Sequence, residues 1–173
     1  MYHFFVEPHQ IGAEEIRIEG ADVNHIRNVL RMKPGEEILI SSREGGDYFC
    51  RVEELEPEYV SAKILEEWEN KELPARIHLF QGLPKGDKME LIIQKAVELG
   101  AYRVVPVSMK RSVVKLDAKK ADAKRKRWNA VSESAAKQSK RSLIPEVAPL
   151  MTYKEAVKEV AGYDMVLLPY ESA

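Results

Sequence analysis

Residues 25–33 read His-Ile-Arg-Asn-Val-Leu-Arg-Met-Lys and place three cations among apolar residues at helical spacing. Arg27 and Arg31 are four residues apart, a spacing that puts both side chains on one face of a predicted helix, with Lys33 just beyond it. Two guanidinium groups on one face can clamp a phosphate, because their planar donors match its oxygens. The same cations could equally pair with neighbouring glutamates, so the spacing alone leaves both interpretations open.

A second polar group runs from Gln81 to Glu98 and follows a predicted strand. It contains a loop rich in glycine and proline and then the first turns of a predicted helix. Ligands of open parallel sheets bind at the carboxyl ends of the strands, and helix N-termini favour anions. The candidate ligand-facing residues of this helix are Lys88, Gln94, Lys95 and Glu98. Lys88 and Lys95 are two turns apart and share a face. An ordinary amphipathic helix is the alternative.

A third group lies between residues 110 and 141, which hold 12 basic and 3 acidic side chains. Arg111 follows a predicted strand, and Gln138 and Arg141 lie at the end of a long predicted helix. Cations along a loop and a helix would follow a phosphate backbone, and such binding weakens as salt rises. A solvated helix face is the alternative. On the same helix, Trp128 is expected to anchor the core rather than to stack on a base.

The usual catalytic and metal-binding motifs are missing from the sequence. It contains no Walker loop and no Gly-x-Gly-x-x-Gly motif. Cys50 falls within a strand pattern, where a buried and inert thiol is expected. The four histidines are scattered without the spacing of metal ligands, so no metal site is predicted.

The formal net charge of −1 conceals opposite charges in the two halves of the chain. Residues 1–73 hold 8 basic and 17 acidic side chains, and residues 74–173 hold 19 basic and 11 acidic ones. This asymmetry suggests two domains and a polyanionic partner for the basic half.

The composition is that of an ordinary globular chain of 173 residues, of which 45% are hydrophobic. No stretch reaches the roughly 18 apolar residues of a membrane span. The N-terminal residues lack the basic start and apolar run of a signal peptide. A single cysteine excludes a disulfide scaffold. We therefore expect a cytoplasmic protein with no membrane partner.

The first half of the chain predicts a small β-barrel. Short runs rich in β-formers indicate strands over residues 3–6, 37–41, 48–55 and 59–65. Gly45-Gly46 predicts a hairpin turn, because glycine accepts a positive φ freely. One helical segment interrupts the strands, with apolar residues from Val23 to Leu30 and Asp22 as its predicted N-cap.

The second half alternates strands and helices, which predicts a parallel α/β sheet. The expected strands cover residues 76–81, 103–107 and 164–168. The expected helices cover residues 87–99, 118–139 and 153–160, and Gly100 stands where a helix C-cap glycine belongs. The acidic stretch 66–74 is the predicted linker, which divides the chain into domains 1–72 and 73–173.

Taken together, these clusters resemble the ribosomal RNA small-subunit methyltransferase E (RsmE) family. Each motif is weak alone, but together and in this order they are specific, and the similarity extends from Phe4 to about Tyr170. The resembling segments are residues 25–35, 84–90, 94–100, 111–112 and 138–141.

The resemblance implies an N-terminal PUA-like β-barrel and a C-terminal SPOUT domain. It implies transfer of a methyl group from S-adenosylmethionine to N3 of a uridine in 16S ribosomal RNA, with the small ribosomal subunit as partner and a homodimer as the active form. Arg27, Arg31 and Lys33 would position RNA. The residues expected to line the RNA-facing cleft are Lys88, Gln94, Lys95, Arg111, Gln138 and Arg141. No catalytic base is identified, and Glu98 is expected to be structural.

The sequence departs from the family pattern in two places. Lys137 replaces a glutamate that usually precedes the Gln-Ser-x-Arg segment, which puts the role of that carboxylate in question. The chain ends at Ala173, whereas the family continues through loops that form the C-terminal trefoil knot and most of the cofactor pocket. From the resemblance we expect a SPOUT domain without its knot, and a chain that is inactive by itself.

Two other hypotheses remain beside the methyltransferase. The chain could be a non-enzymatic RNA-binding protein with a PUA-like module and a basic α/β platform. It could also be an α/β protein whose charges only interact with solvent.

Overall fold

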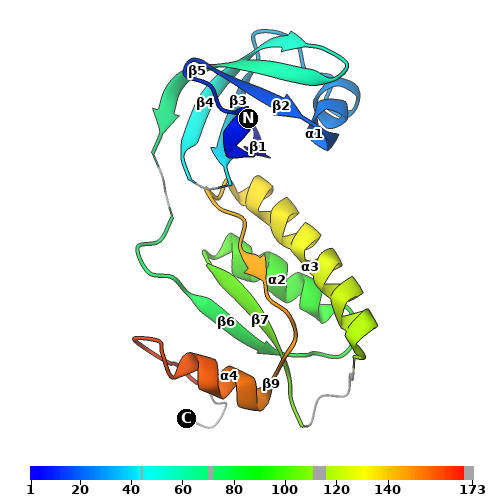
Figure 1. Cartoon of the computed structure of the whole chain (residues 1–173), viewed down its shortest axis with the longest axis vertical. Helices are drawn as coiled ribbons and strands as arrows, with labels where there is room; N and C mark the ends of the chain where they lie inside the picture. The colour runs from blue at the N-terminus through cyan, green and yellow to red at the C-terminus, as the bar shows by residue number, and fades with distance from the viewer. Residues whose placement is uncertain (44, 70–71, 111–115, 170–173) are drawn as a thin grey trace. The chain divides into compact units, whose positions relative to one another are not determined.

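The computed structural model describes residues 1–43, 45–69, 72–110 and 116–169 (Figure 1). The chain divides into two compact units. The first comprises Met1–Ala75 and Glu133–Pro145, and the second comprises Arg76–Ser132 and Glu146–Ala173. The boundary therefore falls within one long helix, and the segment 133–145 belongs to the N-terminal unit.

The N-terminal unit is built on a curled five-stranded sheet with the strand order β1-β3-β4-β5-β2. β1 runs parallel to β3, and the other neighbouring pairs are antiparallel. The strands are β1 (Tyr2–Val6), β2 (Glu15–Glu19), β3 (Glu37–Ser42), β4 (Asp47–Leu55) and β5 (Tyr59–Trp68). Gly45 and Gly46 have φ values of 122° and 94° between β3 and β4, as the predicted hairpin requires.

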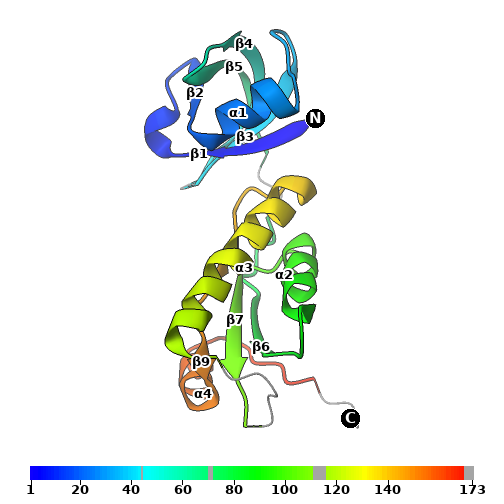
Figure 2. The same ribbon diagram turned by 90° about the vertical axis from the view of Figure 1, so that its right-hand side faces the viewer.

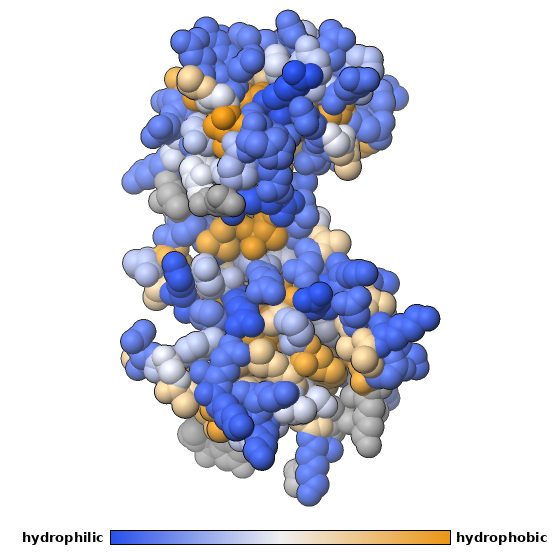
Figure 3. All heavy atoms as spheres, in the orientation of Figure 1, coloured by the Kyte–Doolittle hydropathy of each residue, from blue (hydrophilic) through white to orange (hydrophobic). Residues whose placement is uncertain are grey.

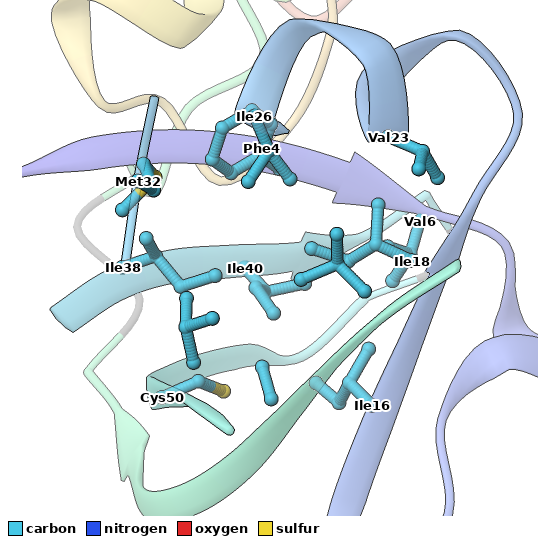
Figure 4. Close-up of a cluster of buried hydrophobic side chains, with 13 residues drawn as sticks. Phe4, Val6, Ile16, Ile18, Val23, Ile26, Met32, Ile38, Ile40 and Cys50 are labelled. Atoms are coloured by element: carbon cyan, nitrogen blue, oxygen red, sulfur yellow. The ribbon is translucent and has the colours of Figure 1, made fainter. Parts of the chain in front are cut away.

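The concave side of this sheet holds the hydrophobic core (Figure 4). Alternate residues of the strands point inward, as the period of two requires. A short helical segment, α1 (Ala21–Asn24) followed by the π-turn η2 (His25–Val29), covers this core and contributes Val23 and Ile26 (Figures 2 and 4). Gly20, with a φ of 75°, is the N-cap of α1, so the prediction that Asp22 is the cap is wrong. Asp22 lies in the first turn instead.

The C-terminal unit contains a parallel sheet in which β6 and β7 are neighbours and β7 also pairs with β8 and β9. Its elements are β6 (His78–Gly82), α2 (Lys88–Glu98), β7 (Arg103–Ser108), α3 (Ala118–Ser139), β8 (Glu146–Val147), β9 (Met151–Thr152) and α4 (Tyr153–Val160). Val105 and Val107 pack with Ala156 of α4, and Val104, which points to the other side of β7, is also fully buried. Both faces of β7 are therefore covered, as is typical of a parallel sheet.

The predicted helices 118–139 and 153–160 are confirmed, and so is the parallel direction of the second sheet. The predicted strand at 164–168 is wrong, because these residues lie outside helices and strands and Met165 to Leu168 are exposed. An apolar run forms a strand only where a sheet edge pairs with it. The short strands β2, β8 and β9 were not predicted. Within the described residues, no helix is long and apolar enough to span a membrane.

Candidate nucleic-acid interface

Arg27 lies in the π-turn η2, whereas Arg31 lies beyond the end of that turn and has a left-handed backbone with a φ of 54°. The prediction that both arginines share one helix face is therefore wrong. The helical segment ends at Leu30, whose N–H donates to the His25 carbonyl at 2.9 Å. The i to i+4 spacing predicts a shared face only while the helix continues.

The turn after η2 is held in place by the core on both sides of Arg31. Ile26 and Met32 are buried, and the Met32 N–H donates to the Ile26 carbonyl at 3.1 Å. This bond closes the end of the turn in the way that a C-cap does, and it needs a left-handed residue between its ends. Arg31 occupies that position, so its side chain is exposed on a fixed backbone.

Arg27, Arg31 and Lys33 take part in none of the ion pairs formed within the described part of the chain. The alternative interpretation, that these cations pair with neighbouring glutamates, therefore has no support from the geometry. The nearby Glu36 accepts a hydrogen bond from the backbone N–H of Lys33 at 2.9 Å and does not pair with the Lys33 ammonium. Cations without a carboxylate partner are available to phosphate oxygens.

The second segment of this unit that bears predicted site residues is the end of α3. The Arg141 N–H donates to the Ala136 carbonyl at 3.0 Å, which closes the helix, and Lys140 lies between them with a φ of 56°. Gln138 is exposed. Arg141 is buried, and its Nε lies 2.9 Å from Glu72 Oε1, which also accepts the N–H of Ser142 at 2.9 Å. The structure therefore gives Arg141 an ion pair with Glu72, and its contact with RNA stays a prediction.

Lys137 joins the two segments. Its ammonium lies 3.2 Å from Asp22 Oδ1 and 3.3 Å from Glu133 Oε1. Asp22 belongs to the helical segment that leads into Arg27, so the ion pair fixes residues 21–33 against the end of α3 within one compact unit. A glutamate at position 137 would repel Asp22, and lysine suits this site.

A buried polar chain lies on the convex side of the same sheet. His3 Nε2 lies 2.8 Å from Ser41 Oγ, and the Ser41 hydroxyl donates to Asp47 Oδ1. Because the Ser41 hydroxyl donates its proton to Asp47, it can only accept from His3, so the His3 N–H is at Nε2. A neutral His3 ring then carries no proton on Nδ1. Burial, assisted by the positive charges of Lys137 and Lys140, lowers the pKa of His3 to about 4. No spacing in the sequence predicts this chain, because its residues come from three strands.

In the C-terminal unit, the predicted polar residues of α2 divide into two groups. Lys88 is exposed and belongs to none of the ion pairs within the described residues. Lys95 lies 2.7 Å from Glu98, and the Gln94 side chain donates to the same carboxylate at 2.9 Å. These hydrogen bonds lower the pKa of Glu98, the opposite of what a general base at neutral pH requires. Glu98 therefore has a structural role.

A small cavity of about 30 Å³ lies at the carboxyl end of β6, next to the first turn of α2. Its apolar floor includes Leu83, Met89 and the buried Trp128. Two ion pairs join α2 to α3 beside it. Lys124 lies 3.9 Å from Asp87, and Arg127 Nε lies 2.7 Å from Glu90 Oε1. A cavity of this volume has room for no more than a few water molecules.

Several cations of α3 are compensated by acidic residues of the same helix region. Lys120 pairs with Asp117, and both Arg125 and Lys126 pair with Asp122. These exposed pairs favour the interpretation that this part of residues 110–141 is a solvated helix face. Arg111 lies outside the described residues. Most of the surface seen in Figure 3 is hydrophilic.

The remaining candidates for chemistry lie in the core or lack partners. Cys50 is buried, and burial raises the pKa of its thiol to about 12, which makes it a poor nucleophile. Among the residues that the structure describes, no group of three or more His, Cys, Asp or Glu side chains could hold a metal ion.

Comparison with known protein families supports an RNA-related role for both units. The profile of the RNA methyltransferase domain matches residues 71–173, and the profile of the RNA methyltransferase PUA domain matches residues 18–65. These matches confirm the predicted fold class, a PUA-like β domain followed by a SPOUT-type parallel α/β domain.

Individual proteins give the same result. The chain is 39% identical to ribosomal RNA small subunit methyltransferase E of Bacillus subtilis and covers 69% of that protein with 100% of its own length. It is 31% identical to the Synechocystis protein of the same name, with 96% of this chain and 54% of the relative covered. The crystal structure of the Neisseria gonorrhoeae protein of that name, bound to S-adenosyl methionine, matches with a TM-score of 0.79 and 34% identity over 92% of this chain and 66% of that one.

Proposed function

Because the chain belongs to the ribosomal RNA small subunit methyltransferase E family, we propose that it serves the methylation of uridine N3 in 16S ribosomal RNA, with S-adenosylmethionine as the methyl donor. Residues 1–72 form the RNA-binding domain in this proposal, and residues 73–173 form the methyltransferase part. The protein works on ribosomal RNA or the small subunit in the cytoplasm, as a homodimer.

The observation that carries the proposal is the set of unpaired cations on the N-terminal unit. Arg27, Arg31 and Lys33 have no carboxylate partner within the described residues, although this half of the chain is strongly acidic. The Lys137–Asp22 ion pair adds the end of α3, with Gln138, to the same unit. A cationic site on an acidic domain attracts phosphates locally rather than through net charge, which favours a defined position of the RNA.

The residues of this chain would bind and orient the RNA. N3 of uridine is weakly acidic, so a held and desolvated base must lose its proton as the methyl group arrives. S-adenosylmethionine supplies an electrophilic methyl group on its sulfonium when it is bound. Lys88, Gln94, Lys95 and Arg111 would contact RNA on the second unit. Gln138 and Arg141 would contact it on the first unit. We assign no residue as the base, because Glu98 already accepts hydrogen bonds from Lys95 and Gln94.

The proposal can be tested in the host of this protein. Deleting the gene should remove N3-methyluridine from small-subunit ribosomal RNA, as measured by mass spectrometry of digested RNA. Re-expression of the whole gene should restore it, and re-expression of that gene with Arg27→Ala and Arg31→Ala should restore it only in part. An unchanged N3-methyluridine content after deletion would contradict the proposal.

A second candidate is a non-enzymatic RNA-binding protein, which the cations Arg27, Arg31 and Lys33, unpaired within the described residues, would suit equally. The same deletion strain distinguishes the two. Unchanged N3-methyluridine, together with salt-sensitive binding of the purified chain to 16S ribosomal RNA, would favour the second candidate.

A further inference from the structure

Lys140 and Arg31 share a rare backbone conformation. Within the described residues, they are the two non-glycine positions with positive φ, at 56° and 54°. A side chain in this region crowds its own backbone, so glycine or asparagine usually occupies it. Both positions carry a long cation instead, and each follows the end of a helical segment.

The helix dipole does not explain this choice. A cation near a helix C-terminus is stabilised by the partial negative charge there, but any residue of the last turn can provide it. At the end of α3, Lys137 and Arg141 already lie in this field with ordinary φ values. A further cation in the strained position between them adds little to the stability of the helix. The left-handed residue closes the helix through the bond from the Arg141 N–H to the Ala136 carbonyl, but glycine would do the same without strain, so the choice of a lysine at this position points to a role in function.

Lys140 is fixed in place by its neighbours on both sides. Lys137 is held by Asp22 and Glu133, and Arg141 is held by Glu72 and by its N–H bond to Ala136. The backbone of Lys140 therefore has little freedom, whereas its side chain is exposed. Lys140 also belongs to none of the ion pairs within the described part of the molecule.

We propose that Lys140 is an RNA-contacting residue that binds a backbone phosphate, held ready for it by the left-handed turn between two anchored neighbours. The proposal rests on the proposed function and extends its binding site by Lys140, a residue that lies within the resembling segment 138–141 but was given no role from the sequence. Its ammonium is a compact point charge with rotatable donors, which suits a phosphate oxygen rather than a base edge. The contact should therefore strengthen binding to any RNA sequence equally.

The test compares four variants of the chain by binding to a fragment of 16S ribosomal RNA over a range of salt concentrations. Lys140→Gln should lower the slope of log affinity against log salt by about one, and weaken binding about fivefold at 0.15 M salt. Lys140→Arg should keep most of the salt slope and most of the affinity. Lys63→Gln is the matched control, because Lys63 is an exposed lysine on β5 of the same unit and is outside the proposed site. It should leave the slope unchanged.

Lys140→Gly separates the effect of the lysine side chain on RNA affinity from the effect of its backbone strain on stability. It should lose RNA affinity as Lys140→Gln does, yet raise the melting temperature by about 2–4 °C, because glycine removes the strain at a positive φ. A variant that lost both affinity and stability would contradict the proposal.

Failure of the inference about Lys140 and failure of the proposed function give different results. If Lys140→Gln binds as the wild type while Arg27→Ala with Arg31→Ala weakens binding, the inference about Lys140 is wrong and the proposed function stands. If the wild type shows no salt-sensitive binding to the RNA, the proposed function itself fails.

Discussion

Lys137 Nζ lies 3.2 Å from Asp22 Oδ1, across 115 residues of sequence. About a quarter of each side chain is exposed, at 26% and 24%, so the pair is partly shielded from water. It joins the end of α3 to the helical segment that leads into Arg27 and Arg31. The two segments with predicted RNA-binding residues in this unit are thereby held in a fixed relation.

The first prediction concerns the strength of that link. A double-mutant cycle with Asp22→Asn and Lys137→Gln should give a coupling free energy of about 0.5–1 kcal/mol, measured by urea unfolding. The matched control is Asp122→Asn with Lys126→Gln, an ion pair whose side chains are 51% and 77% exposed. Its coupling should be below about 0.5 kcal/mol. Equal coupling in the two cycles would show that the Lys137–Asp22 pair does not hold the segments together.

The second prediction concerns the unpaired arginines. Arg27→Ala with Arg31→Ala should weaken RNA binding and lower the log-log salt slope by about 1–2, because each cation that meets a phosphate releases about one counterion. Fluorescence anisotropy with labelled 16S ribosomal RNA fragments measures both quantities.

The control for this pair removes the same charge elsewhere in the unit. Arg17 and Arg51 lie within 4 Å of Glu19 and Glu37, so Arg17→Ala with Arg51→Ala should change the slope by less than about 0.5. An identical loss of slope in the two double variants would mean that net charge, rather than this site, governs binding.

The sequence predicted the elements whose signals are local. Helix α4 follows its N-cap Thr152, whose hydroxyl oxygen accepts the Glu155 N–H at 3.3 Å and whose own backbone N–H donates to the Glu155 carboxylate at 2.7 Å, which makes a capping box. The predicted bounds of α4 are confirmed. The antiparallel pairing of β3 with β4 follows from the Gly45-Gly46 turn. These features depend on residues that are close together in the chain.

The features that were missed depend on distant residues. The left-handed turn at Arg31 arises because Ile26 and Met32 are both held in a core built by other strands. The burial of Arg141 depends on Glu72, 69 residues away. The spacing of residues predicts neither the turn at Arg31 nor the burial of Arg141, because a spacing rule describes an isolated helix or strand. The cations proposed to contact RNA could therefore be named from the sequence, but the division into paired and unpaired cations needed the structure.

The third prediction concerns the Arg141–Glu72 ion pair, whose side chains are only 8% and 14% exposed. Glu72→Ala removes the carboxylate with which this buried guanidinium pairs, so it should lower the free energy of unfolding by about 3 kcal/mol. Glu69→Ala is the control, because Glu69 is exposed and close in sequence, and its cost should be within about 0.5 kcal/mol. Urea unfolding at neutral pH measures both. A loss as small as that of the control would contradict a stabilising role of this ion pair.

The last prediction concerns the effect of pH on the N-terminal unit. The pKa of His3 is about 4 in the folded protein, against 6.5 for an unperturbed histidine. The unfolded chain therefore binds a proton that the folded protein does not between these values, and stability must fall as the pH drops through 6.5 toward 4. From pH 7 to pH 5 the free energy of unfolding should decrease by about 2 kcal/mol on this account.

Urea unfolding at pH 7 and pH 5 measures this change, and His3→Gln should abolish most of it, because glutamine can still donate to Ser41 but does not titrate. His9→Gln, at an exposed histidine, should leave the pH dependence as it is in the wild type. An NMR titration of the His3 ring gives a second reading that does not depend on the stability of the variant. A midpoint near 6.5, or parallel pH profiles for the wild type and His3→Gln, would show that burial does not keep this histidine neutral.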